Sequence, residues 1–285
     1  MATQSDYRMV IDERLESYTT FFDHDWARRI MDLAAGTRLD DCVFSLCVNW
    51  KAAANVHIVP WFTVTSMGHF AEGMTKAHEP LTVKIIKAMA ARLLTEMGDS
   101  LRNMQRKKLS DAIVKIGKEV SEGLERQEDQ EELKPEFYWQ MYLGSQYPHE
   151  FRLIVWGSQR ICYGAVYHAY EDFIRGCARI ASCQQNQTGH TGHKKLMDVV
   201  GRHFGQQVAQ DCLDAPEVRA ARLVRNALAH NGGKESDESR KVQHGIRVEG
   251  GVLQIMAPDT RRLFDVLKER AYNLVEKALT LPNMR

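Results

Sequence analysis

The chain has 285 residues, of which 44% are hydrophobic and 26% are charged, and its formal net charge is +1. This length suits one large domain or two modest ones, and the hydrophobic content can build a sizeable core, which excludes wholesale disorder. The small net charge argues against a protein that coats nucleic acid non-specifically, so any RNA site must be a local patch.

The first half of the chain has helical character. Apolar residues recur there at helical spacing, and glycine, aspartate and proline mark where helices end or begin. Five helices are expected here. Three run over residues 21–35, from Pro80 to Met97 and over residues 111–124, and the other two begin at Asp40 and at Pro60. Asp40 is expected to cap the second helix through its side chain.

An acidic run over residues 125–132 marks the predicted boundary within the chain. We expect an N-terminal helical region of unknown role over residues 1–133 and a second domain over residues 134–285. An exposed helix end would explain the acidic run equally well. Beyond it, a helix predicted over residues 149–183 is apolar around much of its girth, which is typical of a central bundle helix or a dimer interface.

The six cysteines form no Cys-x-x-Cys pair, which predicts buried free thiols in a reducing cytosol. No apolar run is long enough to span a membrane and no secretory signal is visible, so we expect a cytoplasmic protein with no membrane partner. His190 and His193 have no nearby cysteine or acidic residue, so no metal site is expected. No glycine-rich phosphate loop is present, and no cofactor is expected.

A helix predicted to end at residue 230 carries the strongest functional signal. At 100° per residue, its apolar side chains gather on one side, and its other side is polar. The polar side holds Arg219, Arg222, Arg225, Asn226 and His230. Gly232 lies where a left-handed residue would end the helix, which places the imidazole in the last turn. Fixed positive charge beside a group that moves protons near neutral pH suits phosphodiester cleavage without a metal.

Residues 225–230 read Arg-Asn-Ala-Leu-Ala-His, and two short strands around a Glu-Gly-Gly turn and a helix over residues 259–279 are predicted after them. This order resembles the HEPN superfamily (higher eukaryotes and prokaryotes nucleotide-binding), in which an arginine, a polar residue, three residues and a histidine lie near a helix end. The resemblance covers residues 134–285 and implies an all-α bundle with a small β-hairpin after the motif helix. Some HEPN toxins carry a modified tyrosine two residues after the histidine. Gly232 occupies that position here, which puts control by that modification in doubt.

The resemblance also implies an activity and partners. Many members are metal-independent endoribonucleases of toxin–antitoxin or antiphage systems, act as homodimers, and leave 2′,3′-cyclic phosphate ends. On that basis Arg225, Asn226 and His230 would be catalytic, and Arg222 and Arg219 would bind RNA phosphates. An antitoxin or sensor protein would hold such an enzyme inactive.

Two alternatives remain open at the level of sequence. Glu171, in the middle of the central helix, could orient Arg225 or His230, and a structural ion pair would explain it equally well. For its neighbour Asp172, an exposed acidic pair on the helix surface or a structural ion pair is the better explanation. Some HEPN proteins have lost catalysis, so the alternative function is an inactive module that binds nucleotide, RNA or a partner protein.

Overall fold

The computed structural model describes residues 9–66, 149–182, 192–282 and 284, together with isolated residues between 107 and 143. The chain divides into two compact units, residues 1–61 with 147–285 and residues 62–146. All helices and strands labelled below belong to the first unit.

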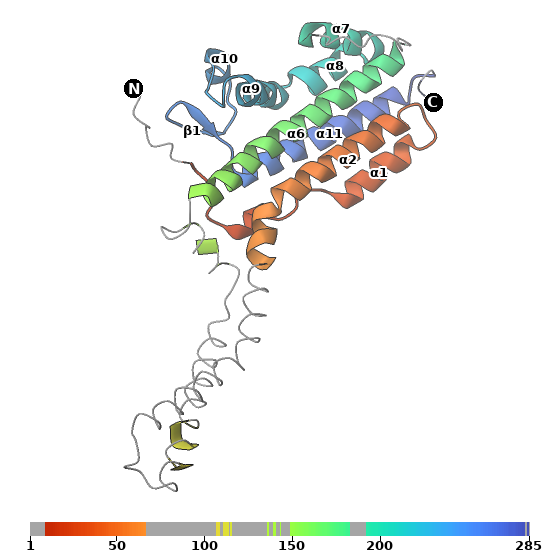
Figure 1. Cartoon of the computed structure of the whole chain (residues 1–285). Helices are drawn as coiled ribbons and strands as arrows, with labels where there is room; N and C mark the ends of the chain where they lie inside the picture. Colours follow the sequence, from red (N-terminus) through yellow and green to blue (C-terminus); the bar gives the residue numbers. More distant parts are fainter. Residues whose placement is uncertain are drawn as a thin grey trace. The chain divides into compact units, whose positions relative to one another are not determined.

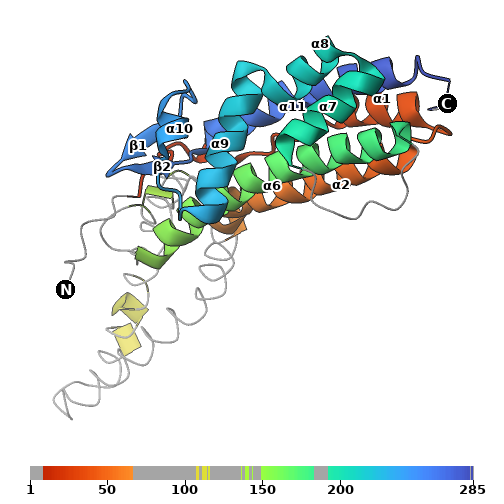
Figure 2. The same cartoon turned by 90° about the horizontal axis from the view of Figure 1, so that it is seen from above.

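The core of this unit is a layer of helices around α6 (His149–Ala181). α6 packs against α2 (Asp40–His57) and α11 (Ala257–Ala278), and α1 (His24–Ala34) packs on α2 and α11 (Figures 1 and 2). The chain enters this layer through a short helical turn, η1 (Leu15–Tyr18). α6 is central because it carries buried side chains along most of its length.

Aromatic side chains from three of these helices meet in the centre of the core. The ring of Trp50 lies 5.3 Å from that of Trp26 and 5.0 Å from that of Phe264, measured between centroids. The indole N–H of Trp50 donates to the carbonyl oxygen of Val166 at 2.9 Å, so this buried donor is satisfied. The packing therefore joins α1, α2 and α11 to α6 in a single hydrophobic core.

A second group of helices covers one side of α6 and α11 (Figure 1). It comprises α7 (His193–Phe204), α8 (Gln206–Ala209), the π-helical turn η3 (Gln210–Asp214) and α9 (Pro216–His230). The hydroxyl of Tyr170 on α6 donates to the carbonyl oxygen of Cys212 at 3.0 Å, which ties this group to the core layer.

A short helix and a hairpin follow α9. α10 (Asp237–Arg240) leads to the antiparallel strands β1 (Arg247–Glu249) and β2 (Val252–Gln254), with Val248 opposite Leu253. Gly250 and Gly251 have φ angles of 57° and 77°. A two-residue turn with both residues in the left-handed region matches the twist of the strands it joins, and glycine adopts it without strain.

The predicted fold class is confirmed: the described chain is mostly helical, with one small antiparallel hairpin. The central helix, the motif helix and the closing helix begin and end within a few residues of the predicted bounds. Asp40 does not cap α2 as expected. Leu39 occupies the cap position, and the carboxylate of Asp40 accepts from the backbone N–H of Gly36 at 3.3 Å.

The predicted boundary between residues 133 and 134 does not separate the N-terminal helices from the rest. α1 and α2 belong to the same unit as α6 to α11, because they bury their tryptophans against helices far away in sequence. The helices expected from Pro80 to Met97 and over 111–124, and the acidic run, lie largely outside the described residues. Five of the six cysteines are described and are free, four of them buried and Cys42 half-buried.

Candidate functional site

The motif helix α9 begins at Pro216, where proline suits the first turn, and ends at His230. Its apolar side is buried, and its last turn is closed by two backbone N–H groups, those of Asn231 and Gly233, which both donate to the carbonyl oxygen of Ala227. Gly232 has a φ angle of 62°, so the expected left-handed residue after the helix is confirmed. His230 is exposed at this end.

Arg225 projects from α9 toward α6, where it forms an ion pair with Glu171. Arg175, one turn further along α6, donates to the other oxygen of the same carboxylate at 2.6 Å. The guanidinium carbon of Arg225 also lies 5.5 Å from the ring centroid of Tyr167. Of the two partners considered for Glu171, Arg225 is the one it contacts, whereas Asp172 is exposed and pairs with His168.

The charge balance of this cluster is positive. Glu171 is only 8% exposed. Its burial alone would raise the pKa of the carboxyl group, but the hydrogen bond from Arg175 and the charge of Arg225 outweigh burial, and the pKa of Glu171 is lowered. One carboxylate thus faces two guanidinium groups.

Arg222 and His193 lie close enough to this cluster to interact with it. His193, the first residue of α7, is half-buried, and its pKa is lowered first by burial and then by the charge of Arg222, against the opposing charges of Asp214 and Glu171. The Nε atoms of Arg222 and Arg225 are buried, and within the described part of the chain neither has a hydrogen-bond partner. Each guanidinium group therefore keeps an unused donor.

The remaining predicted site residues spread around α9. At 100° per residue, His230 lies about 140° around the helix axis from Arg225. Asn226 is half-buried and Arg219 is exposed. Asn226 and His230 stand one turn apart, but no hydrogen bond joins them. Within one chain the fold therefore pairs Arg225 with Glu171, and it leaves His230 exposed at the end of the helix.

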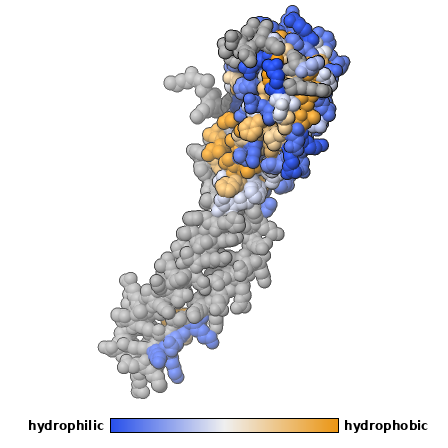
Figure 3. Space-filling view, turned by 90° about the vertical axis from the view of Figure 1, so that its right-hand side faces the viewer, coloured by the Kyte–Doolittle hydropathy of each residue, from blue (hydrophilic) through white to orange (hydrophobic). Residues whose placement is uncertain are grey.

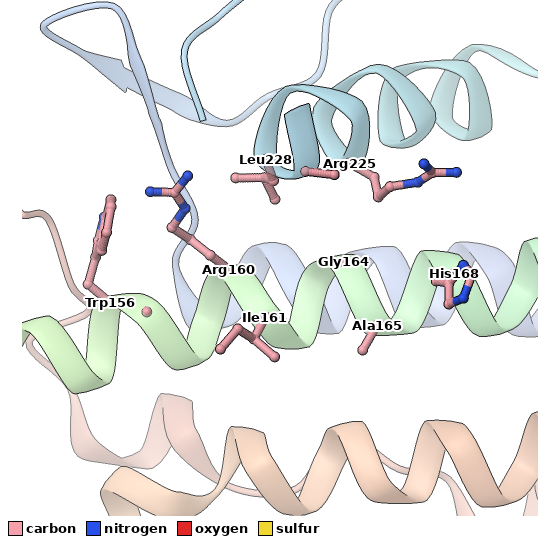
Figure 4. A pocket seen from close by; sticks show the side chains of 10 residues that line it. Trp156, Arg160, Ile161, Gly164, Ala165, His168, Arg225 and Leu228 are labelled. Carbon is pink, nitrogen blue, oxygen red and sulfur yellow. The ribbon is translucent and has the colours of Figure 1, made fainter. Parts of the chain in front are cut away.

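A groove with a volume of about 620 Å³ runs between α6 and α9 (Figure 4). Among the residues that line it are Trp156, Arg160, Ile161, Gly164, Arg225 and Leu228. The guanidinium carbon of Arg160 lies 4.2 Å from the ring centroid of Trp156. The groove therefore has Arg160 stacked on Trp156 among its lining residues, together with Arg225 from the cluster with Glu171.

The chain after α9 holds the end of that helix in place. The carbonyl oxygen of Gly233 accepts from the N–H of Leu253 at 2.9 Å, and the N–H of Glu235 donates to the carbonyl oxygen of Gly251. His244 accepts from the N–H of Ile246 through Nδ1, so its Nε2 donates to the carboxylate of Glu235 at 3.1 Å. The predicted hairpin thus has a structural role: it clamps the turn that follows His230.

Four residues of this region were not predicted from sequence as site residues: Trp156, Arg160, Arg175 and His193. Two of them belong to pairs that the sequence contains at helical spacing, Trp156 with Arg160 and Glu171 with Arg175. His193 has no such signal, because its position follows from how α7 packs.

Groups of three or more histidine, cysteine or acidic side chains that could hold a metal do not occur among the described residues. Within the same residues no single helix is long and apolar enough to cross a bilayer. One bent pair, Asp40–His57 with Val59–Ser66, reaches the required length and composition when taken together.

Comparison with protein-family models found no matching family, and neither the curated proteins nor the solved structures gave a match to this chain.

Proposed function

We propose that this protein is a metal-independent endoribonuclease of HEPN type. The observation that carries the proposal is the setting of the motif helix. Arg225 is held by a buried carboxylate beside an open groove, while the histidine of the same motif stands exposed at a clamped helix end. A guanidinium group held in place and an imidazole that can transfer protons are groups that suit RNA cleavage by the 2′-hydroxyl.

In the proposed reaction the ribose 2′-oxygen attacks the adjacent phosphorus and the bond from phosphorus to the 5′-oxygen breaks. One proton leaves the 2′-hydroxyl and one reaches the 5′-oxygen, so the products are a 2′,3′-cyclic phosphate and a 5′-hydroxyl. His230 is the proposed general base or acid, and Arg225 stabilises the charge on the phosphoryl oxygens. Arg222 and Arg219 bind neighbouring phosphates, Asn226 orients the imidazole or the phosphate, and Glu171 positions Arg225.

We further propose that the active form is a homodimer. Arg225 and His230 diverge by about 140° around α9, so a single chain presents them in different directions. A two-fold axis beside α9 would let a phosphate contact Arg225 of one protomer and His230 of its partner. Figure 3 shows an apolar area on one face of the molecule, a feature that often marks a surface of association between proteins.

The proposed setting is a cytoplasmic toxin or antiphage defence system, with an antitoxin or sensor protein as the controlling partner. The second candidate is an inactive HEPN-like module that binds nucleotide, RNA or a partner protein. The ion pair with Glu171 favours it, because an arginine held by a buried carboxylate can be a structural residue.

One experiment separates the two candidates. Purified wild type and His230→Ala are incubated in EDTA with labelled single-stranded RNA and with a tRNA pool. The nuclease proposal expects cleavage by wild type alone, with 2′,3′-cyclic phosphate ends. Binding without product from either protein, in the presence of its co-purifying partners as well, would favour the inactive module.

A further inference from the structure

The groove between α6 and α9 contains a stacked pair that the proposed cleavage chemistry does not use. The guanidinium group of Arg160 lies over the indole of Trp156 at 4.2 Å, and both side chains are half-buried. In Figure 4 they stand side by side at one end of the groove, on the face of α6 that looks toward α9.

Trp156 is held before any ligand arrives, and Arg160 packs between its indole and the backbone of Gly233. The indole N–H of Trp156 donates to Oε1 of Gln254 at 2.9 Å, and Gln254 is 1% exposed on β2. The guanidinium group of Arg160 lies against Gly233, where an added Cβ would clash with it. A preorganised pair of this kind loses little conformational entropy when a ligand binds.

The rest of the groove offers an apolar surface beside positive charge. An added Cβ at Gly157 or Gly164 would meet no atom within 4 Å, so space lies over both glycines. Ile161, between them, is 66% exposed. Arg225 lines the same groove from α9. A volume of about 620 Å³ lies within the range of small-ligand sites.

These features together describe a surface for a planar ring attached to an anion. We propose that the groove is a nucleobase-stacking subsite for single-stranded RNA, in which a base lies on the Trp156–Arg160 pair and the apolar floor. Neighbouring phosphates face Arg160 and Arg225. This inference rests on the proposed function, since that function supplies RNA as the ligand.

The anchoring of Trp156 determines what kind of recognition the subsite performs. The side-chain hydrogen-bond donor of Trp156 is already used by Gln254, so the pair offers a base the planar groups of an indole and a guanidinium rather than a polar atom of the indole. Stacking on a ring face tolerates all four bases. A base within a duplex is already stacked, so the subsite selects unpaired RNA over paired RNA and discriminates little between bases.

The test measures binding without cleavage. The probe is a fluorescein-labelled 2′-O-methyl oligoadenosine, whose methylated 2′-oxygen cannot attack, and its anisotropy is followed with the full-length protein. We expect Trp156→Ala to weaken binding roughly tenfold and Trp156→Phe to stay within about threefold of wild type. Phe44→Ala, which removes an aromatic ring that is 59% exposed on α2, is the matched control and leaves binding unchanged.

Two comparison probes separate the contribution of the bases from that of the phosphates and of single-strandedness. A strand of the same length without bases is expected to bind more weakly and to be insensitive to Trp156→Ala, because it keeps the phosphates and loses the rings. The oligoadenosine paired with its complement is also expected to bind more weakly. Equal losses in Trp156→Phe and Trp156→Ala would assign the effect to the bond with Gln254 and overturn the subsite.

The subsite and the nuclease proposal can fail separately. Unchanged binding in Trp156→Ala overturns the subsite even if wild type cleaves RNA and His230→Ala does not. Weakened binding in Trp156→Ala supports the subsite even if no RNA is ever cleaved, an outcome that removes the nuclease proposal alone. No binding of the oligoadenosine by wild type overturns the subsite.

Discussion

The carboxylate of Glu171 and the guanidinium group of Arg225 form an ion pair that joins the central helix α6 to the motif helix α9. Each group is mostly buried, and Arg175 completes the arrangement from one turn along α6. The orientation of Arg225 is therefore a property of two helices, and removing the carboxylate should affect both the fold and the site.

Glu171→Gln should lower the free energy of unfolding by roughly 2 kcal/mol, because two guanidinium groups would lose their shared partner. It should also slow RNA cleavage roughly 10- to 100-fold through misplacement of Arg225. Urea denaturation and initial cleavage rates measure the two effects. Asp172→Asn, which alters an exposed pair on the same helix, is the control and should change neither. If Glu171→Gln kept the stability and the cleavage rate of wild type, the ion pair with Glu171 would not be what positions Arg225.

His230→Ala and Arg225→Ala should each abolish detectable cleavage while the protein stays folded. Loss of the proton-transfer group alone removes about 10²- to 10⁴-fold in rate. His24→Ala, at an exposed histidine on α1, is the matched control and should cleave RNA as wild type does. Circular dichroism checks the fold of all three. Cleavage retained in either motif variant would remove the catalytic assignment.

A mixed dimer tests whether the site is shared between protomers. If Arg225 of one chain acts with His230 of its partner, a dimer of one Arg225→Ala chain and one His230→Ala chain has one intact site. Differently tagged chains, co-expressed and purified together, should then show about half the wild-type rate, although each variant alone is inactive. An inactive mixed dimer would place both groups of each site on one chain.

Stability should fall in mild acid because of His57. This side chain is fully buried on α2 against Phe21 and Tyr18, and its Nε2 donates to the carbonyl oxygen of Ser17 at 3.2 Å. Burial lowers the pKa of His57 from 6.5 to about 4. The folded state thus binds this proton less readily than the unfolded chain does. The free energy of unfolding should be constant above pH 6.5 on this account and decrease by roughly 3 kcal/mol as pH falls toward 4.

Urea denaturation at neutral pH and near pH 4.5, on wild type and His57→Phe, measures this contribution. The variant should lose less stability than wild type between the two pH values, because its ring takes up no proton. His24→Ala keeps the buried imidazole and should follow wild type. The same pH dependence in His57→Phe and wild type would mean that His57 is not the group responsible.

The ends and lengths of helices were predictable from sequence where neighbouring residues alone determine them. The end of α9 follows from Gly232, and the long course of α6 follows from its apolar pattern. The place of Asp40 was mispredicted because a side chain that can cap a helix can also accept a bond from the preceding turn.

Features that depend on packing were not predictable in this way. Nothing in residues 21–57 shows that their tryptophans meet Phe264, so the N-terminal helices looked like a separate region. Glu171 and Arg225 are 54 residues apart, and only the packing of α6 on α9 selects Glu171 over Asp172. The same holds for Trp156, whose partner Gln254 lies 98 residues away.

Gly233 is the point of the backbone where α9, strand β2 and the side chain of Arg160 meet. Its N–H closes the last turn of α9, its carbonyl oxygen receives a bond from β2, and its Cα side faces the guanidinium group of Arg160 without room for a methyl group. A φ angle of 83° adds a conformational reason for glycine. The side chain of Arg160 in the groove, the end of α9 and strand β2 therefore all meet at a residue that has no side chain of its own.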